Sequence, residues 1–188
     1  MNTQIKICGL STPETIDAAV GAGATHLGLV HYEQSPRHVS LEQGAALRAR
    51  VPEQVKVVLL LVNADPQLTA RAIMSVRPDI VQFHGSETPE WLGLLRQNTR
   101  IGIWKAIGVR DAASLERANR YRGAADLLLY DAPAKALPGG NGLAIDWSLF
   151  ARHKALMPWG LAGGLTPGNV AEAIRDTGAS LVDTSSDV

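Results

Sequence analysis

Eight short apolar runs, rich in leucine, valine and isoleucine, recur along this chain of 188 residues and constrain its fold more than any other feature. Longer segments with helical periodicity separate them, and this alternation is typical of repeated βα units around a parallel sheet. The predicted strands cover residues 4–8, 25–31, 55–62, 79–83, 101–107, 125–131, 158–162 and 180–184. The sequence therefore predicts an α/β protein built on a parallel sheet.

The number of strands distinguishes between the two common parallel architectures. An open doubly wound sheet more often has about five or six strands, whereas eight in this order fit a (β/α)8 barrel, the TIM barrel. Nothing in the sequence indicates a second domain, so we expect residues 1–188 to form a single barrel domain. The chain is short for a barrel and stops at Val188, directly after the eighth predicted strand. We therefore expect the final helix, which would close the ring, to be absent from this sequence.

Charge and cysteine content narrow the functional classes. The chain has 18 basic and 18 acidic side chains, interspersed, with a formal net charge of zero. We therefore expect neither a nucleic acid nor a membrane as a partner. A single cysteine cannot form an internal disulfide, which favours a reducing compartment such as the cytoplasm. The sequence has no signal-peptide pattern and no apolar run of transmembrane length, so we expect a soluble, cytoplasmic protein.

Capping residues mark the expected helix starts. A capping side chain or a proline stands where a first helical turn would begin in Ser11-Thr12-Pro13-Glu14, Ser40-Leu41-Glu42, Asp65-Pro66 and Thr166-Pro167. A short helical segment is also expected at Asp146-Trp147. Before it, residues 132–142 are rich in glycine and proline, which predicts a long βα loop. That loop is either a lid over the functional face or a plain connector.

Two titratable side chains stand at the carboxyl ends of predicted strands. Cys8 ends the first strand and Asp131 ends the sixth. In a barrel these ends open into the same mouth, where the catalytic groups of this architecture gather. A thiol and a carboxyl group there can transfer protons at two positions of one small substrate, one as base and the other as acid. The alternatives are a small buried apolar residue for Cys8 and a loop cap for Asp131.

The loops after the last two strands predict a phosphate site. Gly163 and Gly164 follow the seventh strand, and the run Asp183-Thr184-Ser185-Ser186 ends the eighth. Glycine lets backbone N–H groups approach an anion and hydroxyl groups add donors, so barrels commonly hold phosphate at this place.

Two further side chains are candidates for substrate binding. Arg37, in Ser35-Pro36-Arg37 after the second strand, suits a carboxylate or a phosphate, unless it is a solvated surface arginine. His84, after the fourth strand, either donates to a substrate oxygen or satisfies its own loop. The remaining histidines show no ligand spacing with one another or with Cys8, so we expect no metal site.

Taken together, these motifs resemble those of phosphoribosylanthranilate isomerase, in order and across nearly the whole chain. The segments that carry the resemblance are Lys6-Ile7-Cys8-Gly9, Ser35-Pro36-Arg37, Gln82-Phe83-His84-Gly85, Leu129-Tyr130-Asp131, Gly139-Gly140-Asn141-Gly142, Asp146-Trp147, Gly163-Gly164-Leu165 and Val182-Asp183. The resemblance implies a (β/α)8 barrel that uses no cofactor. It also implies an isomerase of tryptophan biosynthesis, which converts N-(5-phosphoribosyl)anthranilate into 1-(2-carboxyphenylamino)-1-deoxyribulose 5-phosphate by an Amadori rearrangement.

By matching motif, the resemblance implies that Cys8 is the general base and Asp131 the general acid. Cys8 then needs nearby positive charge or amide dipoles to be partly thiolate, and Asp131 needs desolvation to keep its proton near neutral pH. The implied substrate contacts are Arg37 with the anthranilate part, Asp183 with a sugar hydroxyl, and Gly163, Gly164, Ser185 and Ser186 with the phosphate. Lys6 shares the inward face of Cys8 and needs a carboxylate partner, which the sequence does not identify.

The chain departs from the family pattern at three places. Asp187 stands where the family usually has glycine, the long loop reads Gly-Gly-Asn-Gly-Leu where a hydroxyl and a lysine are usual, and the last helix is missing. A non-catalytic barrel that binds a sugar phosphate is therefore one alternative. The related isomerase of histidine biosynthesis is another, although it uses two aspartates and this chain has Cys8 at the first position. We expect a monomer or a homodimer.

Overall fold

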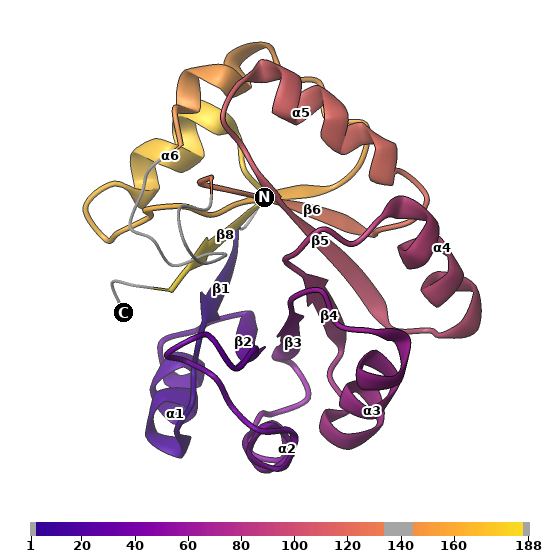
Figure 1. The fold of residues 1–188 in the computed structure, drawn as a ribbon. Coiled ribbons are helices and arrows are strands. Elements are labelled where there is room, and N and C mark those ends of the chain that lie inside the picture. The colour runs from indigo at the N-terminus through magenta and orange to yellow at the C-terminus, as the bar shows by residue number, and fades with distance from the viewer. Residues whose placement is uncertain (1–2, 134–144, 186–188) are drawn as a thin grey trace.

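A computed structural model describes residues 3–133 and 145–185, and in it eight parallel strands close into a barrel (Figure 1). Each strand pairs with the next in sequence, and β8 returns to pair with β1. The strands are β1 (Gln4–Cys8), β2 (His26–His31), β3 (Lys56–Leu61), β4 (Ile80–Phe83), β5 (Gly102–Gly108), β6 (Leu127–Asp131), β7 (Trp159–Leu161) and β8 (Leu181–Thr184). The predicted (β/α)8 barrel is therefore confirmed, with each strand end within two residues of its expected position.

Helices follow most of the strands and surround the barrel (Figure 1). The α-helices of the described residues are α1 (Pro13–Gly21), α2 (Leu41–Arg48), α3 (Pro66–Val76), α4 (Pro89–Asn98), α5 (Ala112–Ala118) and α6 (Val170–Thr177). Two 3-10 helices complete the set, η1 (Asn119–Tyr121) after α5 and η2 (Trp147–Arg152) between β6 and β7. No helix of the described residues is long and apolar enough to cross a membrane.

The strands are buried on both faces, which is why they are almost continuously apolar. Their alternate side chains form two layers of core. Val58, Trp104 and Leu129 belong to a small cluster contributed by the strands and the residues that adjoin them, which fills the barrel interior. Ile103 and Leu128, on the opposite face, belong to a larger cluster that includes side chains of the helices. A residue's position within its strand therefore decides whether it faces the barrel interior or the helix layer.

Three of the expected helix starts are confirmed and one is wrong. Thr12, Ser40 and Asp65 cap α1, α2 and α3, each accepting a hydrogen bond from a backbone N–H of the first turn. Thr166-Pro167 does not begin a helix, because α6 begins at Val170. The carboxamide of Asn169 accepts from the N–H of Thr166 (2.8 Å) and donates to the carbonyl of Gly164 (2.9 Å). These two bonds close a turn ahead of the helix.

The connection from β6 to β7 carries the expected short helical segment as the 3-10 helix η2. Asp146 caps it by accepting from the N–H of Ser148 (3.0 Å). Most of the glycine-rich loop, residues 134–144, lies outside the described residues, and so do Ser186 and Asp187. The predictions made for those positions therefore stay predictions.

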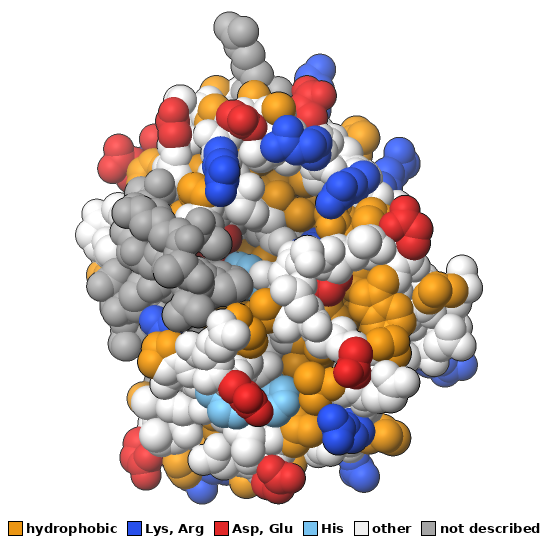
Figure 2. All heavy atoms as spheres, in the orientation of Figure 1, with side chains coloured by type: hydrophobic (Ala, Val, Ile, Leu, Met, Phe, Trp, Pro, Cys, Tyr) orange, Lys and Arg blue, Asp and Glu red, His pale blue; other side chains and the backbone are white. Residues whose placement is uncertain are grey.

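The flank of β1 and β8 carries an apolar groove of about 240 Å³, bounded on its other side by α6. Ile5, Val170, Ile174 and Val182 are among its lining residues, and Ile5 is 41% exposed. Elsewhere the surface is mixed in charge: Figure 2 shows acidic and basic side chains interspersed on one face, with Lys and Arg gathered over α5.

Candidate active site

The carboxyl ends of the strands bring together the side chains that the sequence singled out. Cys8 ends β1, Asp131 ends β6 and Asp183 lies in β8. His84 follows the last residue of β4, and Arg37 lies in the loop after β2. All of these positions face the mouth of the barrel, where parallel (β/α)8 folds place their chemistry.

Cys8 lies in a space that its neighbouring strand leaves open. Its thiol is buried, and the residue is 6% exposed among Val30 and Leu60. The register of β1 with β2 places Gly28 directly beside Cys8. A Cβ atom at Gly28 would lie 2.7 Å from Sγ of Cys8, so a larger residue there displaces the thiol. Gly28, which has no side chain, therefore leaves the space that the Cys8 thiol occupies.

Lys6 supplies the positive charge that Cys8 was expected to need. It lies two residues earlier on the same inward face, with Nζ 2.8 Å from both carboxylate oxygens of Asp183. Burial raises the pKa of the Cys8 thiol, and the charge of Lys6 acts in the opposite direction. Burial would lower the pKa of Lys6 itself, but Asp183 and Cys8 together raise it above its ordinary value. Lys6 therefore stays charged beside the thiol, and Asp183 is its carboxylate partner.

Asp131 is held at both of its oxygens. Oδ1 accepts from the N–H of Ala132 at 2.7 Å, and Oδ2 lies 3.3 Å from Nε2 of His84. The other ring nitrogen of His84, Nδ1, lies 3.4 Å from Nε2 of Gln82. The amide nitrogen of Gln82 is a donor, which fits the His84 tautomer that carries its proton on Nε2, the ring nitrogen beside Asp131. His84 thus contacts the carboxyl group expected to act as the acid.

Arg37 lies against the loop that follows Cys8. Gly9 has φ of +87°, and a Cβ atom there would collide with the side chain of Arg37. The guanidinium also lowers the pKa of Cys8, although less than Lys6 does, and burial outweighs both. The structure therefore places Arg37 at the mouth and half-buried rather than free in solvent. Its contact with the anthranilate part of a substrate stays a prediction.

The loop after β7 lies against the ends of β6 and β8, at the place where the sequence predicts a phosphate site. Gly163 and Gly164 have φ of +84° and +66°, which favour glycine. A Cβ at Gly163 would lie 2.7 Å from the backbone nitrogen of Ala132, so this loop packs against the end of β6. The hydroxyl of Thr184 donates to the carbonyl of Leu165 (2.9 Å) and joins the loop after β7 to the end of β8. Ser185 follows directly, whereas Ser186 is outside the described residues.

The sequence motifs predict no role for Gln82, yet its side chain is almost fully buried and approaches His84. Strand periodicity was the available signal, because residues two apart in or beside a strand share a face. The motifs likewise predict no role for Glu87 and Lys105. These two side chains form a buried ion pair beside the β4 loop, with Oε2 of Glu87 3.3 Å from Nζ of Lys105. Across the described ranges, residues 3–133 and 145–185, no group of three His, Cys, Asp or Glu side chains is arranged to hold a metal ion.

Known proteins resemble this chain in sequence and in fold. The enzyme N-(5'-phosphoribosyl)anthranilate isomerase of Erythrobacter litoralis is 64% identical over 186 residues, which are 99% of this chain and 89% of that protein. The crystal structure of phosphoribosyl anthranilate isomerase from Thermotoga maritima has a TM-score of 0.89 at 32% identity, covering 97% of this chain and 87% of the other.

A further solved structure of such an isomerase was determined in complex with reduced 1-(o-carboxyphenylamino)-1-deoxyribulose 5-phosphate. It has a TM-score of 0.87 at 32% identity, over 99% of this chain and 88% of that one. The model of the family described as N-(5'phosphoribosyl)anthranilate (PRA) isomerase matches residues 5–188. The chain therefore belongs to the N-(5'-phosphoribosyl)anthranilate isomerase family.

Proposed function

We propose that Cys8 and Asp131 carry out the reaction of this family, the Amadori rearrangement of N-(5'-phosphoribosyl)anthranilate in tryptophan biosynthesis, as general base and general acid. One observation supports this assignment most: both side chains lie at the same mouth of the closed barrel, each less than a tenth exposed. The reaction needs one group that gives a proton and another that removes one. A thiol and a carboxyl group on separate strands meet that need.

In the first step, the carboxyl group of Asp131 gives its proton to the oxygen of the furanose ring. The bond between that oxygen and C1 breaks, and the ring opens to an iminium ion. The carboxylate left behind accepts from the N–H of Ala132, and His84, with its proton on Nε2, presents a second N–H 3.3 Å from the other oxygen. Hydrogen bonds to an ionised group are strong, so these donors stabilise the product of the proton transfer.

In the second step, the thiolate of Cys8 removes the proton from C2. The electron pair of that C–H bond forms the double bond between C1 and C2, and the iminium nitrogen becomes neutral. The resulting enolamine tautomerises to the ketone at C2. The ammonium of Lys6 is the nearby charge that favours the thiolate, and Asp183 keeps it in place. The iminium withdraws electrons from C2, so a modest base suffices.

Substrate binding uses the side chains around this pair. Arg37 suits the anthranilate carboxylate, because a guanidinium binds carboxylates through two parallel hydrogen bonds. Asp183 accepts from a sugar hydroxyl while Lys6 holds its carboxylate, and the Nε2–H of His84, beside Asp131, donates to a substrate oxygen. The phosphate is assigned to Gly163, Gly164, Ser185 and Ser186.

The test is a turnover assay. The substrate is generated in place from anthranilate and phosphoribosyl pyrophosphate by the preceding enzyme, and the loss of its fluorescence is followed. We expect rapid loss with the native chain and a decrease of about 10³-fold or more with Cys8→Ala or Asp131→Asn. Met74→Ala is the control, because Met74 is exposed on the outer helix α3.

Two results would contradict the proposal. Turnover by Cys8→Ala at the native rate excludes the thiol as the base. No turnover by the folded native chain, together with tight binding of the substrate analogue, favours the alternative of a non-catalytic barrel that binds sugar phosphates.

We further propose a compartment and an oligomeric state for the enzyme. It acts in the cytoplasm on a small phosphoribosylated substrate and uses no cofactor, and it does so as a monomer or a homodimer. Analytical ultracentrifugation measures which of the two states holds, and fractionation of cells measures the compartment.

A further inference from the structure

Lys105 is a buried charge that the proposed reaction does not use. Its neighbours in β5, Trp104 and Ala106, belong to the cluster that fills the barrel interior. Lys105 alternates with them and therefore faces the helix layer. Its side chain is nevertheless only 3% exposed. A lysine is almost never buried to this degree unless its charge and its donors are satisfied.

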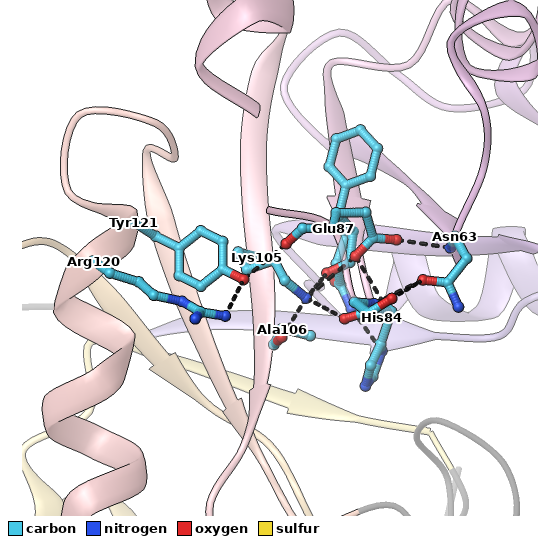
Figure 3. A network of polar contacts seen from close by, with 11 residues as sticks. Asn63, His84, Glu87, Lys105, Ala106, Arg120 and Tyr121 are labelled. Carbon is cyan, nitrogen blue, oxygen red and sulfur yellow. Dashed lines mark hydrogen bonds and ion pairs between the residues drawn. The ribbon is translucent and has the colours of Figure 1, made fainter. Parts of the chain in front are cut away.

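The ammonium of Lys105 uses its donors on the backbone around His84 (Figure 3). It donates to the carbonyls of Gly85 (2.8 Å), Ala106 (2.9 Å) and Phe83 (3.2 Å). An ammonium has three N–H groups, so these three acceptors match its full capacity. Phe83 and Gly85 are the residues immediately before and after His84. Lys105 thus binds the chain on both sides of the histidine.

Glu87 holds the same loop from the other side. Its Oε2 accepts from the N–H of Gly85 (2.9 Å) and lies 3.3 Å from Nζ of Lys105. Its Oε1 accepts from the N–H of Asn63 (2.8 Å), at the end of β3. The hydroxyl of Tyr121 donates to the carbonyl of Glu87 (2.8 Å). The loop is therefore joined to the segment after β3, to β5 and to the 3-10 helix η1, as Figure 3 shows.

The side chain of Asn63, just after β3, makes a second contact with this loop. Oδ1 of Asn63 accepts both from the N–H of Ser86 (2.7 Å) and from its hydroxyl (2.9 Å). A Cβ atom at Gly85 would collide with Asn63, so the two segments are in close contact. The β4 loop has no room to shift while these bonds hold.

We propose that Glu87 and Lys105 are positioning residues, which fix the β4 loop so that His84 stays in contact with Asp131. Neither side chain faces the mouth, so neither touches the substrate. They act through the backbone of the loop, whose only side chain directed at Asp131 in the described contacts is that of His84. In its kinetic consequences this inference rests on the proposed function, but the contact between His84 and Asp131 can be measured without it.

The first experiment is a double-mutant cycle. Lys105→Met keeps the length and the apolar part of the side chain but removes the three donors. We expect kcat/KM to fall about tenfold, because the displaced histidine no longer supports Asp131. In a His84→Asn background the same change should lower kcat/KM less than about twofold, since the group through which Lys105 acts is already gone.

Lys56→Met is the matched control. Lys56 is also a strand lysine with an aspartate partner, but its side chain is 50% exposed and lies at the start of β3, at the opposite end of the barrel. This variant loses the same charge and should leave kcat/KM unchanged. A tenfold decrease from Lys105→Met in both backgrounds would show a general structural role and overturn the inference.

The second experiment measures the contact between His84 and Asp131 by NMR. The ring nitrogens of His84, assigned by the loss of signal in His84→Asn, are observed by ¹⁵N NMR. In the native chain the Nε2 signal should shift when Asp131 is replaced by asparagine. In Lys105→Met that sensitivity should disappear, and if it persists the inference is wrong. Tyr121→Phe, which removes one bond to the loop and no charge, takes the place of Lys105→Met if that variant does not fold.

The two proposals fail separately. A native chain without turnover overturns the proposed function, and the NMR comparison still decides the positioning role. A native chain with turnover whose Lys105 variants behave additively overturns only the positioning role.

Discussion

The barrel buries two lysines beside carboxylates, and their surroundings give them different roles. Lys6 lies inside the barrel, and its ammonium contacts both oxygens of Asp183. Lys105 lies in the helix layer, where it binds three backbone carbonyls and is 3.3 Å from Glu87. One lysine is held mainly by a side chain, and the other mainly by the backbone.

The pKa directions follow from that difference. Burial acts to lower the pKa of both lysines. At Lys6 the carboxylate of Asp183 and the thiol of Cys8 outweigh burial, so its pKa is raised. At Lys105 Glu87 offsets only part of the effect, and its pKa is lowered. The comparison teaches that a buried lysine paired with a carboxylate can act on a neighbouring thiol, whereas one bound to carbonyls fixes the backbone.

Replacing Lys6 should have the largest effect on activity. In Lys6→Met, Cys8 loses the main cation that opposes burial, so the pKa of its thiol rises further and less thiolate is available. We expect turnover to fall about 10³-fold. The rise of kcat with pH, which reports deprotonation of the base, should move to higher pH. The rate of alkylation of Cys8 against pH measures the same pKa independently.

Lys105→Met is the comparison variant for this measurement, because Lys105 does not interact with the thiol. Its alkylation profile should match that of the native chain. Equal profiles for Lys6→Met and the native chain would mean that Lys6 does not control the thiol.

The free energy of unfolding should distinguish the Lys105–Glu87 pair from the Lys6–Asp183 pair. Lys105→Met leaves the Glu87 carboxylate buried beside no cation, and we expect it to lower the free energy of unfolding by about 3 kcal/mol. Adding Glu87→Gln should recover only a small part, because the bonds of the ammonium to the three carbonyls are still lost. At the other pair, Asp183→Asn should recover most of the stability that Lys6→Met loses, since there the carboxylate is the main partner.

Urea unfolding of the two single and the two double variants measures these differences. Equal recovery at both pairs would remove the distinction between a lysine held by a side chain and one held by the backbone.

Acid should lower the stability of the fold by a smaller amount, through His26, a neighbour of Lys6. His26 pairs with Lys6 in the register of β1 and β2, and its ring lies tilted against that of Trp104. Burial and the charge of Lys6 lower the pKa of His26 from 6.5 to about 4. Asp79 and Lys56, which act on it in opposite directions, do not change this outcome.

The sign of the effect follows from linkage. The folded state keeps His26 neutral, whereas the unfolded chain binds a proton below pH 6.5. The contribution of His26 to stability is therefore fully present above pH 6.5 and is lost as the pH falls towards 4. Thermal unfolding between these pH values should show a smaller decrease in Tm for His26→Gln than for the native chain. An identical decrease would exclude His26 as a source of acid sensitivity.

Much of the architecture could be predicted because its signals are local. The apolar runs located all eight strands, and three caps located helix starts to the residue, since both patterns arise within a few positions of the chain. At Thr166-Pro167 the expected helix start is wrong, because the side chain of Asn169, three residues on, closes a turn there and the helix begins after it. The positions of Cys8 and Asp131 at strand ends followed directly from the strand boundaries.

The sequence by itself determined which residues stand at the ends of strands and which face Lys6 shares with Cys8, because strand periodicity is a property of the backbone. The tertiary structure alone decided the partners. Asp183 is 177 residues from Lys6 and meets it only because β8 closes against β1. Lys105 reads in the sequence as one more strand residue, and its role depends on how the β4 loop folds over it. Buried charges must find partners, and only the closed barrel determines which ones are within reach.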